Sequence, residues 1–270
     1  MSARITQGLT AVALIIQISA FSAYAAGTPA NTQVSNTATV DYSISGTPQP
    51  TATSPSVTFV VDRKINFAVA EVGGAYTTVA AGALAQAMKF TIVNSSNDTM
   101  DFALSYTHDA GSLDPFGGTD SFDTTNVRLF RDSDNNGIFS PADIQITSPF
   151  FLDEVSPDLT LTLFVVSDIP AGQPGNTISS GSLKAIAHAG GGTGALGARH
   201  AKTIGPNTPL VVDTVLADAA GSASGDAAGD GQHSDNDAYK VSASPPTPTP
   251  LAVEKSFFVV VDPQNQTVNP

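Results

Sequence analysis

The chain contains no cysteine and no tryptophan, and it is poor in positive charge. Without cysteine, neither a disulfide nor a thiolate nucleophile nor a zinc–thiolate site can form. Stability must therefore come from the core, or from a metal held by oxygen ligands. The 270 residues include 11 Lys and Arg against 24 Asp and Glu, which gives a formal net charge of −13. This acidic balance disfavours nucleic acid and anionic membranes as partners and suits a protein that takes up divalent cations.

Helical periodicity is nearly absent, and short alternating segments separated by Gly, Pro, Asn and Asp take its place. Strict alternation occurs in 38–44, 100–106 and 159–163, and the second of these places Met, Phe, Leu and Tyr on one face. The other strand candidates are 57–61, 65–69, 88–93, 127–130, 144–147, 210–216 and 238–241. Many short half-buried strands predict an all-β fold, an antiparallel Ig-like or jelly-roll type β-sandwich with a C-terminal extension strand.

The first 25 residues have the pattern of a secretory signal peptide. Arg4 gives a positive start, 9–21 is apolar, and small residues at positions 23 and 25 predict cleavage before Ala26. The alternative is an N-terminal membrane anchor, for which the apolar run is short. We therefore expect a secreted protein, extracellular or on the cell surface, without a transmembrane segment in its mature form.

The rest of the chain divides by composition. Residues 26–244 form the predicted sandwich region, with a division into two sub-domains near 110–125 left open. The proline-rich stretch 245–250 predicts a stiff linker, and 251–270 contains a strongly strand-forming segment. Because strand backbone must pair somewhere, this segment is a candidate donor strand for another copy of the chain. Its candidate assembly residues are Val253, Phe257, Phe258, Val259, Val260 and Val261.

Residues 132–143 (DSDNNGIFSPAD) have the spacing of a calcium-binding loop. Oxygen-bearing side chains recur at alternate positions, glycine stands at the sixth position where such a loop turns sharply, and an acid closes it at the twelfth. The predicted ligands are Asp132, Asp134, Asn136, Ile138 through its carbonyl, Ser140 and Asp143. Aspartate replaces the usual glutamate at the twelfth position, and the alternative is an Asx-rich turn without metal. Because strands are predicted on both sides, we expect a Ca²⁺ clamp between strands.

A second acidic stretch, 217–237, has no apolar periodicity and is predicted to be a long surface loop. It offers a candidate second calcium site, although the spacing is irregular and a solvated connection is the alternative. The candidate ligands are Asp218, Asp226, Asp230, Asp235 and Asp237.

Signals for catalysis are weak. The glycine pattern of 192–197 lacks the strand–helix unit that a dinucleotide site needs, so a glycine-rich loop is predicted. The histidines have no paired zinc-ligand spacing, and no serine has the nucleophile-elbow pattern. Asp153 and Glu154 are adjacent, which in a regular strand points them to opposite faces. We therefore expect a protein that is not an enzyme.

Several segments resemble large secreted bacterial surface proteins that carry Ig-like "conserved repeat" domains of unknown function. The resemblance lies in 26–43 (AGTPANTQVSNTATVDYS), 127–143 (VRLFRDSDNNGIFSPAD), 164–172 (FVVSDIPAG) and 230–241 (DGQHSDNDAYKV). Residues 253–270 are similar to the lead-in of a following repeat. The resemblance implies an extracellular β-sandwich without an established activity.

Together these features predict a secreted, calcium-stabilised structural protein of a surface or matrix that self-associates into extracellular filaments by strand donation. The main alternative is an adhesin or glycan-binding module whose partners are surface proteins or glycans. A calcium-dependent extracellular hydrolase is a third hypothesis.

Overall fold

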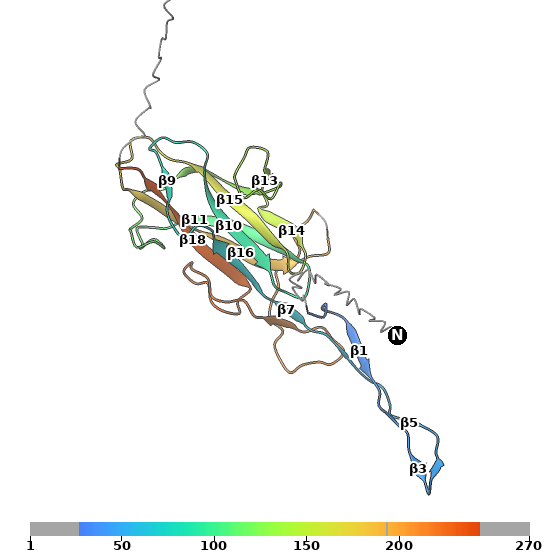
Figure 1. Ribbon diagram of the computed structural model, residues 1–270. Helices are drawn as coiled ribbons and strands as arrows, with labels where there is room; N and C mark the ends of the chain where they lie inside the picture. The colour runs from blue at the N-terminus through green and yellow to red at the C-terminus, as the bar shows by residue number, and fades with distance from the viewer. Residues whose placement is uncertain (1–26, 193, 244–270) are drawn as a thin grey trace, which may run out of the picture.

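The computed structural model describes residues 27–192 and 194–243, and every regular element in this part of the chain is a β-strand (Figure 1). The all-β prediction is therefore confirmed. The predicted signal peptide, proline-rich linker and C-terminal strand lie outside the described residues. No helix long and apolar enough to cross a membrane occurs in the described ranges.

Two five-stranded sheets pack face to face, as the sandwich prediction requires (Figure 1). The first sheet contains, in spatial order, β13 (Ile144–Ile146), β12 (Thr125–Arg131), β15 (Thr160–Asp168), β10 (Gln86–Asn94) and β8 (Phe67–Glu71). The second contains β14 (Phe151–Val155), β11 (Met100–His108), β16 (Ile178–Ala189), β18 (Gln232–Val241) and β9 (Thr77–Val79). All pairs in these sheets are antiparallel except β18 with β9.

Strands from before and after residues 110–125 share both sheets. β10 pairs with β15 in the first sheet, and β11 pairs with β16 in the second. The segment 110–125 therefore connects two layers of one sandwich, and the division into two sub-domains considered there does not occur.

The inward faces of the two sheets form one hydrophobic core. Met100 and Phe102 are fully buried and Leu104 nearly so, while Tyr106 packs against the same cluster, as the alternation in this segment predicts. Deeply buried partners from other strands include Phe67, Met88, Phe90, Ile92, Leu163, Val165 and Leu183. Among the described residues, those of the core lie within 65–241.

Tyr239 on β18 links the two layers through its side chain. It is fully buried, and its hydroxyl donates toward the carbonyl oxygens of Gln86, at 2.8 Å, and Val165, at 3.1 Å, both in the opposite sheet. Burial raises the pKa of this phenol well above its ordinary value. The hydroxyl therefore has hydrogen-bond partners inside the core, as buried tyrosine hydroxyls usually do.

Side chains from the second sheet cover the edge of β8. The Val69 amide donates to His233 Nδ1 at 3.1 Å, and the Glu71 amide donates to Asp235 Oδ2 at 2.8 Å. Both acceptors come from β18, so the two sheets are joined along this side. Unpaired edge amides are a template for aggregation, and these two are occupied.

An N-terminal ribbon projects from one end of the sandwich (Figure 1). It consists of three successive antiparallel pairs, β1 (Gln33–Asn36) with β6 (Val57–Val60), β2 (Thr39–Val40) with β5 (Ala52–Thr53) and β3 (Ser43–Ile44) with β4 (Thr47–Pro48). We call residues 33–60 the arm. The prediction that 38–44 is a half-buried strand is wrong, because β2 and β3 are exposed and no other described strand packs on them.

A short parallel pair, β7 (Arg63–Ile65) with β17 (Thr214–Leu216), connects the arm to the sandwich. β17 is shorter than the predicted strand 210–216. The longest strand, β16, escaped prediction because its sequence ISSGSLKAIAHA is built from small residues. β18 begins at Gln232 and not near residue 238. Residues 232–237 of the predicted surface loop 217–237 therefore belong to this strand.

Candidate metal centre

The predicted calcium loop, residues 132–143, joins β12 to β13 at one edge of the first sheet. Arg131 and Ile144 are directly paired, so the loop closes on itself within a strand hairpin. Gly137 has φ +71° and Asn135 has φ +55°, the left-handed conformation that glycine and asparagine tolerate. Strands flank the loop on both sides, as the sequence predicts.

Three of the six predicted ligands gather in this loop. Oxygen atoms of Asp132, Asp134 and Asp143 lie within 4.8 Å of one another. Asp132 and Asp143 are buried, at 3% and 6% exposure, whereas Asp134 faces solvent. Hard cations such as Ca²⁺ prefer a group of carboxylate oxygens of this kind.

Asp132 has an oxygen that the protein leaves unsatisfied. Its Oδ2 accepts a hydrogen bond from the Gly137 amide at 2.8 Å, but its Oδ1 is buried and has no partner in the described chain. Burial alone would raise the pKa of Asp132, yet the Gly137 amide and neighbouring hydrogen bonds lower it below its usual value. A buried, ionised oxygen without a partner is costly, so these residues fit a bound cation.

The other predicted ligands have local hydrogen bonds. Asn136 Oδ1 accepts from the Ile138 amide at 2.6 Å, and Ser140 Oγ accepts from the Ala142 amide at 3.2 Å. These contacts shape the turn, and they are also what a metal-free Asx turn would make. Calcium binding itself therefore stays a prediction.

No ammonium or guanidinium group of the described chain neutralises the three carboxylates. The salt bridges of the described residues lie outside the loop and join Arg63 to Asp98 and Arg128 to Asp168. Lys89 reaches the loop, but its Nζ donates to the Gly137 carbonyl at 3.3 Å. Among residues 27–192 and 194–243, no cationic side chain is thus paired with Asp132, Asp134 or Asp143.

Phe139 fixes the loop to the outer face of the first sheet. Its ring lies 5.0 Å from that of Phe130 and 5.8 Å from that of Phe164. A flexible polar turn would have no such anchor. Sequence reasoning did not assign Phe139 a role, although an aromatic residue inside a polar loop was the available signal.

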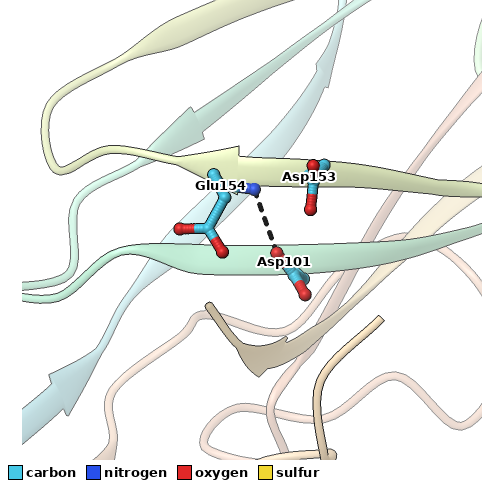
Figure 2. A group of neighbouring side chains, drawn as sticks. All are labelled: Asp101, Asp153 and Glu154. Carbon is cyan, nitrogen blue, oxygen red and sulfur yellow. Dashed lines mark hydrogen bonds between the residues drawn. The ribbon is translucent and has the colours of Figure 1, made fainter. Parts of the chain in front are cut away.

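A second acidic cluster lies where β11 and β14 meet (Figure 2). Oxygen atoms of Asp101, Asp153 and Glu154 lie within 4.8 Å of one another. The prediction that Asp153 and Glu154 point to opposite faces is wrong, because the strand is irregular here. Glu154 has φ +53°, and the pairing register shifts between Met100 and Phe102. A bulge of this kind re-aims a side chain.

The glycine-rich segment folds over this cluster and donates its amides to it. Glu154 Oε1 accepts from Gly191 and, at 2.7 Å, from Gly192. Asp153 Oδ2 accepts from Gly194 at 2.8 Å, and Asp101 Oδ2 accepts from Gly197 at 2.9 Å. These amides are the groups that would bind a phosphate in a dinucleotide site, and here carboxylates occupy them. The acids therefore hold the loop in place.

Gly197 is expected to be the least replaceable residue of this loop. A Cβ at this position would overlap the backbone carbonyl of Ala189, whereas one at Gly192 meets nothing within 4 Å. Gly197→Ala should lower the free energy of unfolding by about 2 kcal/mol, because the backbone of β16 must move. Urea denaturation measures this, with Gly192→Ala as the matched control. Equal stability of the two variants would contradict the packing described.

The structure does not gather the acids of 217–237, the candidate second metal site, into a group of three or more metal-capable side chains. The described chain has three or more metal-capable side chains together in two places, and neither includes these residues. Asp218 accepts from the amides of Asp230 and Gly231, and Asp226 accepts from the Ser234 hydroxyl. Most of 217–231 is exposed, as the alternative of a solvated connection predicts, but Asp218 and Asp226 are buried. Asp218 and Asp226 therefore organise the loop that precedes β18, whereas Asp235 and Asp237 lie on that strand.

Comparison with known proteins adds no family. No family model matches the chain, and no curated protein matches it. A solved structure titled "AvmM Catalyzes Macrocyclization in Alchivemycin A Biosynthesis" overlaps 70% of this chain and 95% of its own, with 10% identity and a TM-score of 0.26. A similarity this slight supports no argument about fold or function.

Proposed function

We propose that this protein is a secreted, non-enzymatic structural component of a bacterial surface or extracellular matrix, stabilised by Ca²⁺ at residues 132–143. The observation that carries the proposal is the unpartnered, buried oxygen of Asp132 beside two further carboxylates. The predicted signal peptide supports export, and a chain without cysteine has no disulfide to stabilise it outside the cell.

In this proposal the ion is a clamp. Asp132 directly follows β12, and Asp143 directly precedes β13. An ion bound by both residues would therefore hold the ends of these two strands together. A calcium sensor needs flanking helices that change their angle, and strands flank this loop. Bound calcium would therefore add stability without a large conformational change.

The second part of the proposal is self-association. The strand-forming segment 251–262 follows a proline-rich linker and is rich in Val and Phe. Strand addition to a neighbouring copy would satisfy its backbone and join copies into filaments.

Negative-stain microscopy and sedimentation of the mature chain, in calcium and in chelator, test this function. We expect filaments from the full chain and none from a chain that lacks 245–270. The described core lies within 65–241, so the shortened chain keeps it. Filaments of equal mass from both chains would contradict strand donation.

A glycan-binding or adhesive function is the second candidate, favoured by an open pocket of about 380 Å³. Its lining includes His108, Asp109, Asp120, Phe122 and Asp123, a mixture of carboxylates with one aromatic ring. Binding to a glycan array by a chain that does not polymerise would support this candidate over the first.

A further inference from the structure

We infer that the N-terminal arm, residues 33–60, is the acceptor for strand 251–262 of a second copy. This inference rests on the proposed self-association and names the surface that receives the strand. It would make the assembly head-to-tail, because β18, the last described strand, ends at the end of the sandwich opposite to the arm (Figure 1).

The arm has the features of an incomplete sheet. It is only two strands wide, and an isolated two-stranded hairpin is marginal in water unless a third strand or another layer covers it. In the described chain, the hydrogen bonds of residues 33–58 stay within the arm. Its outer edges therefore remain available for pairing.

Large apolar side chains of the arm face solvent. Val34 and Phe59 are directly paired and share one face, and Val57 lies two residues from Phe59 on that face. The exposed fractions are 58% for Val40, 46% for Tyr42, 59% for Ile44, 69% for Val57 and 48% for Phe59. Such a concentration of exposed apolar side chains on a projecting element marks an interaction surface.

The strand-forming segment matches the arm in length and character. Residues 251–262 cover the same number of positions as 33–44, the first half of the arm. The segment carries Phe257, Phe258 and three consecutive valines, which pack well on a pleated apolar surface.

The distance between the end of β18 and the arm decides whether segment 251–262 can pair with the arm of its own molecule. β8 and β18 run side by side in the same direction, with Val69 beside His233 and Glu71 beside Asp235. β6 and β7 precede β8 and lead away to the arm, whereas β18 ends at the opposite end of the sandwich (Figure 1).

The linker is too short to return to its own arm. At about 3.3 Å per residue, Val60 lies roughly 55 Å from Val241 along this path. The ten residues from Val241 to Leu251 span at most about 36 Å when fully extended. A strand that pairs along its whole length, from Leu251 onward, therefore meets the arm of another copy, and a head-to-tail contact of this kind repeats into an open filament.

Two arm substitutions test the acceptor in the full-length chain. Ile44→Lys with Phe59→Lys should weaken assembly about a hundredfold, because charge replaces two apolar contacts. Both side chains are about half exposed, so thermal unfolding of the unassembled protein should not change. Leu113→Lys, at a 75% exposed position outside the arm, is the matched control and should assemble normally. Normal filaments from the arm variant would overturn the assignment.

Cross-linking locates the donor strand directly, since the chain contains no other cysteine. Full-length Val259→Cys is mixed with Val57→Cys on the arm or with Gln145→Cys on β13, and a short bis-maleimide is added. We expect linked dimers with Val57→Cys. Dimers only with Gln145→Cys would overturn the arm as acceptor but keep strand donation. No linked dimer and no filament would overturn both the inference and the proposed self-association.

Discussion

Calcium at a hundredfold excess over its dissociation constant is expected to raise the free energy of unfolding by about 2.7 kcal/mol. The gain should disappear in the variant Asp132→Ala/Asp134→Ala, which removes the buried unpartnered oxygen and an adjacent carboxylate. Without calcium, the variant should differ little from the natural chain, because the lost Gly137 hydrogen bond is offset by relief of repulsion between carboxylates. Urea denaturation in calcium and in chelator measures both effects.

Two controls separate this loop from other acids. Asp123→Ala removes an exposed carboxylate outside both clusters and should leave the calcium effect intact. Asp153→Ala removes, from the cluster of Asp101, Asp153 and Glu154, the carboxylate that has an unpartnered oxygen in the described chain. If calcium still stabilises Asp132→Ala/Asp134→Ala but no longer stabilises Asp153→Ala, the ion binds at the cluster of Asp101, Asp153 and Glu154 and not at the loop.

The second large effect concerns Asp237, whose substitution by Asn should stabilise the protein at neutral and alkaline pH. Asp237 is 2% exposed on β18, opposite Gly181. Burial raises the pKa of this carboxyl to about 7, and the charges of Glu71 and Asp235 act in the same direction. Its unfolded pKa is about 3.9. Between these values the folded state binds the extra proton, so stability falls as pH rises from about 4 to about 7.

At pH 8, Asp237→Asn should therefore exceed the natural chain by on the order of 4 kcal/mol, and the difference should vanish near pH 4. Urea denaturation at several pH values in chelator follows the effect. Asp168→Asn is the control of opposite sign. Hydrogen bonds from Ala85 and Asn126 lower the pKa of Asp168, so its removal should destabilise at neutral pH and matter less in acid. A pH-independent difference for Asp237→Asn would contradict the buried, protonated carboxyl.

Alternation in the sequence predicted the fold class and several strands well. The clearest case is 100–106, where Met100, Phe102 and Leu104 are buried as expected. Alternation failed for β16 because its inward positions hold Gly181, Ala185 and Ala187, whose small side chains give no hydrophobic contrast. Alternation gave a wrong prediction of burial for 38–44. A period of two shows that a strand has an apolar face, but it does not show whether another layer covers that face.

The candidate site was predictable where its residues are close in sequence. Spacing alone identified Asp132, Asp134 and Asp143, because one loop supplies all three. The cluster of Asp101, Asp153 and Glu154 was not predictable, since it needs the register of β11 against β14 and the positive φ of Glu154. Likewise, the partners of Asp218 and Asp226 in the loop before β18 were not predictable, because they depend on the positions of the Asp230 and Gly231 amides and of the Ser234 hydroxyl.

Tyr239 also gives the molecule an internal optical probe. The chain has five tyrosines and no tryptophan, so tyrosine dominates its near-ultraviolet spectrum. The Tyr239 hydroxyl is held by carbonyl groups of the opposite sheet, and its raised pKa keeps it protonated for as long as the two layers stay together. Burial raises the pKa of Tyr106 as well, so the tyrosine absorbance that develops late in alkali reports, without a label, the exposure of these two core phenols as the sandwich unfolds.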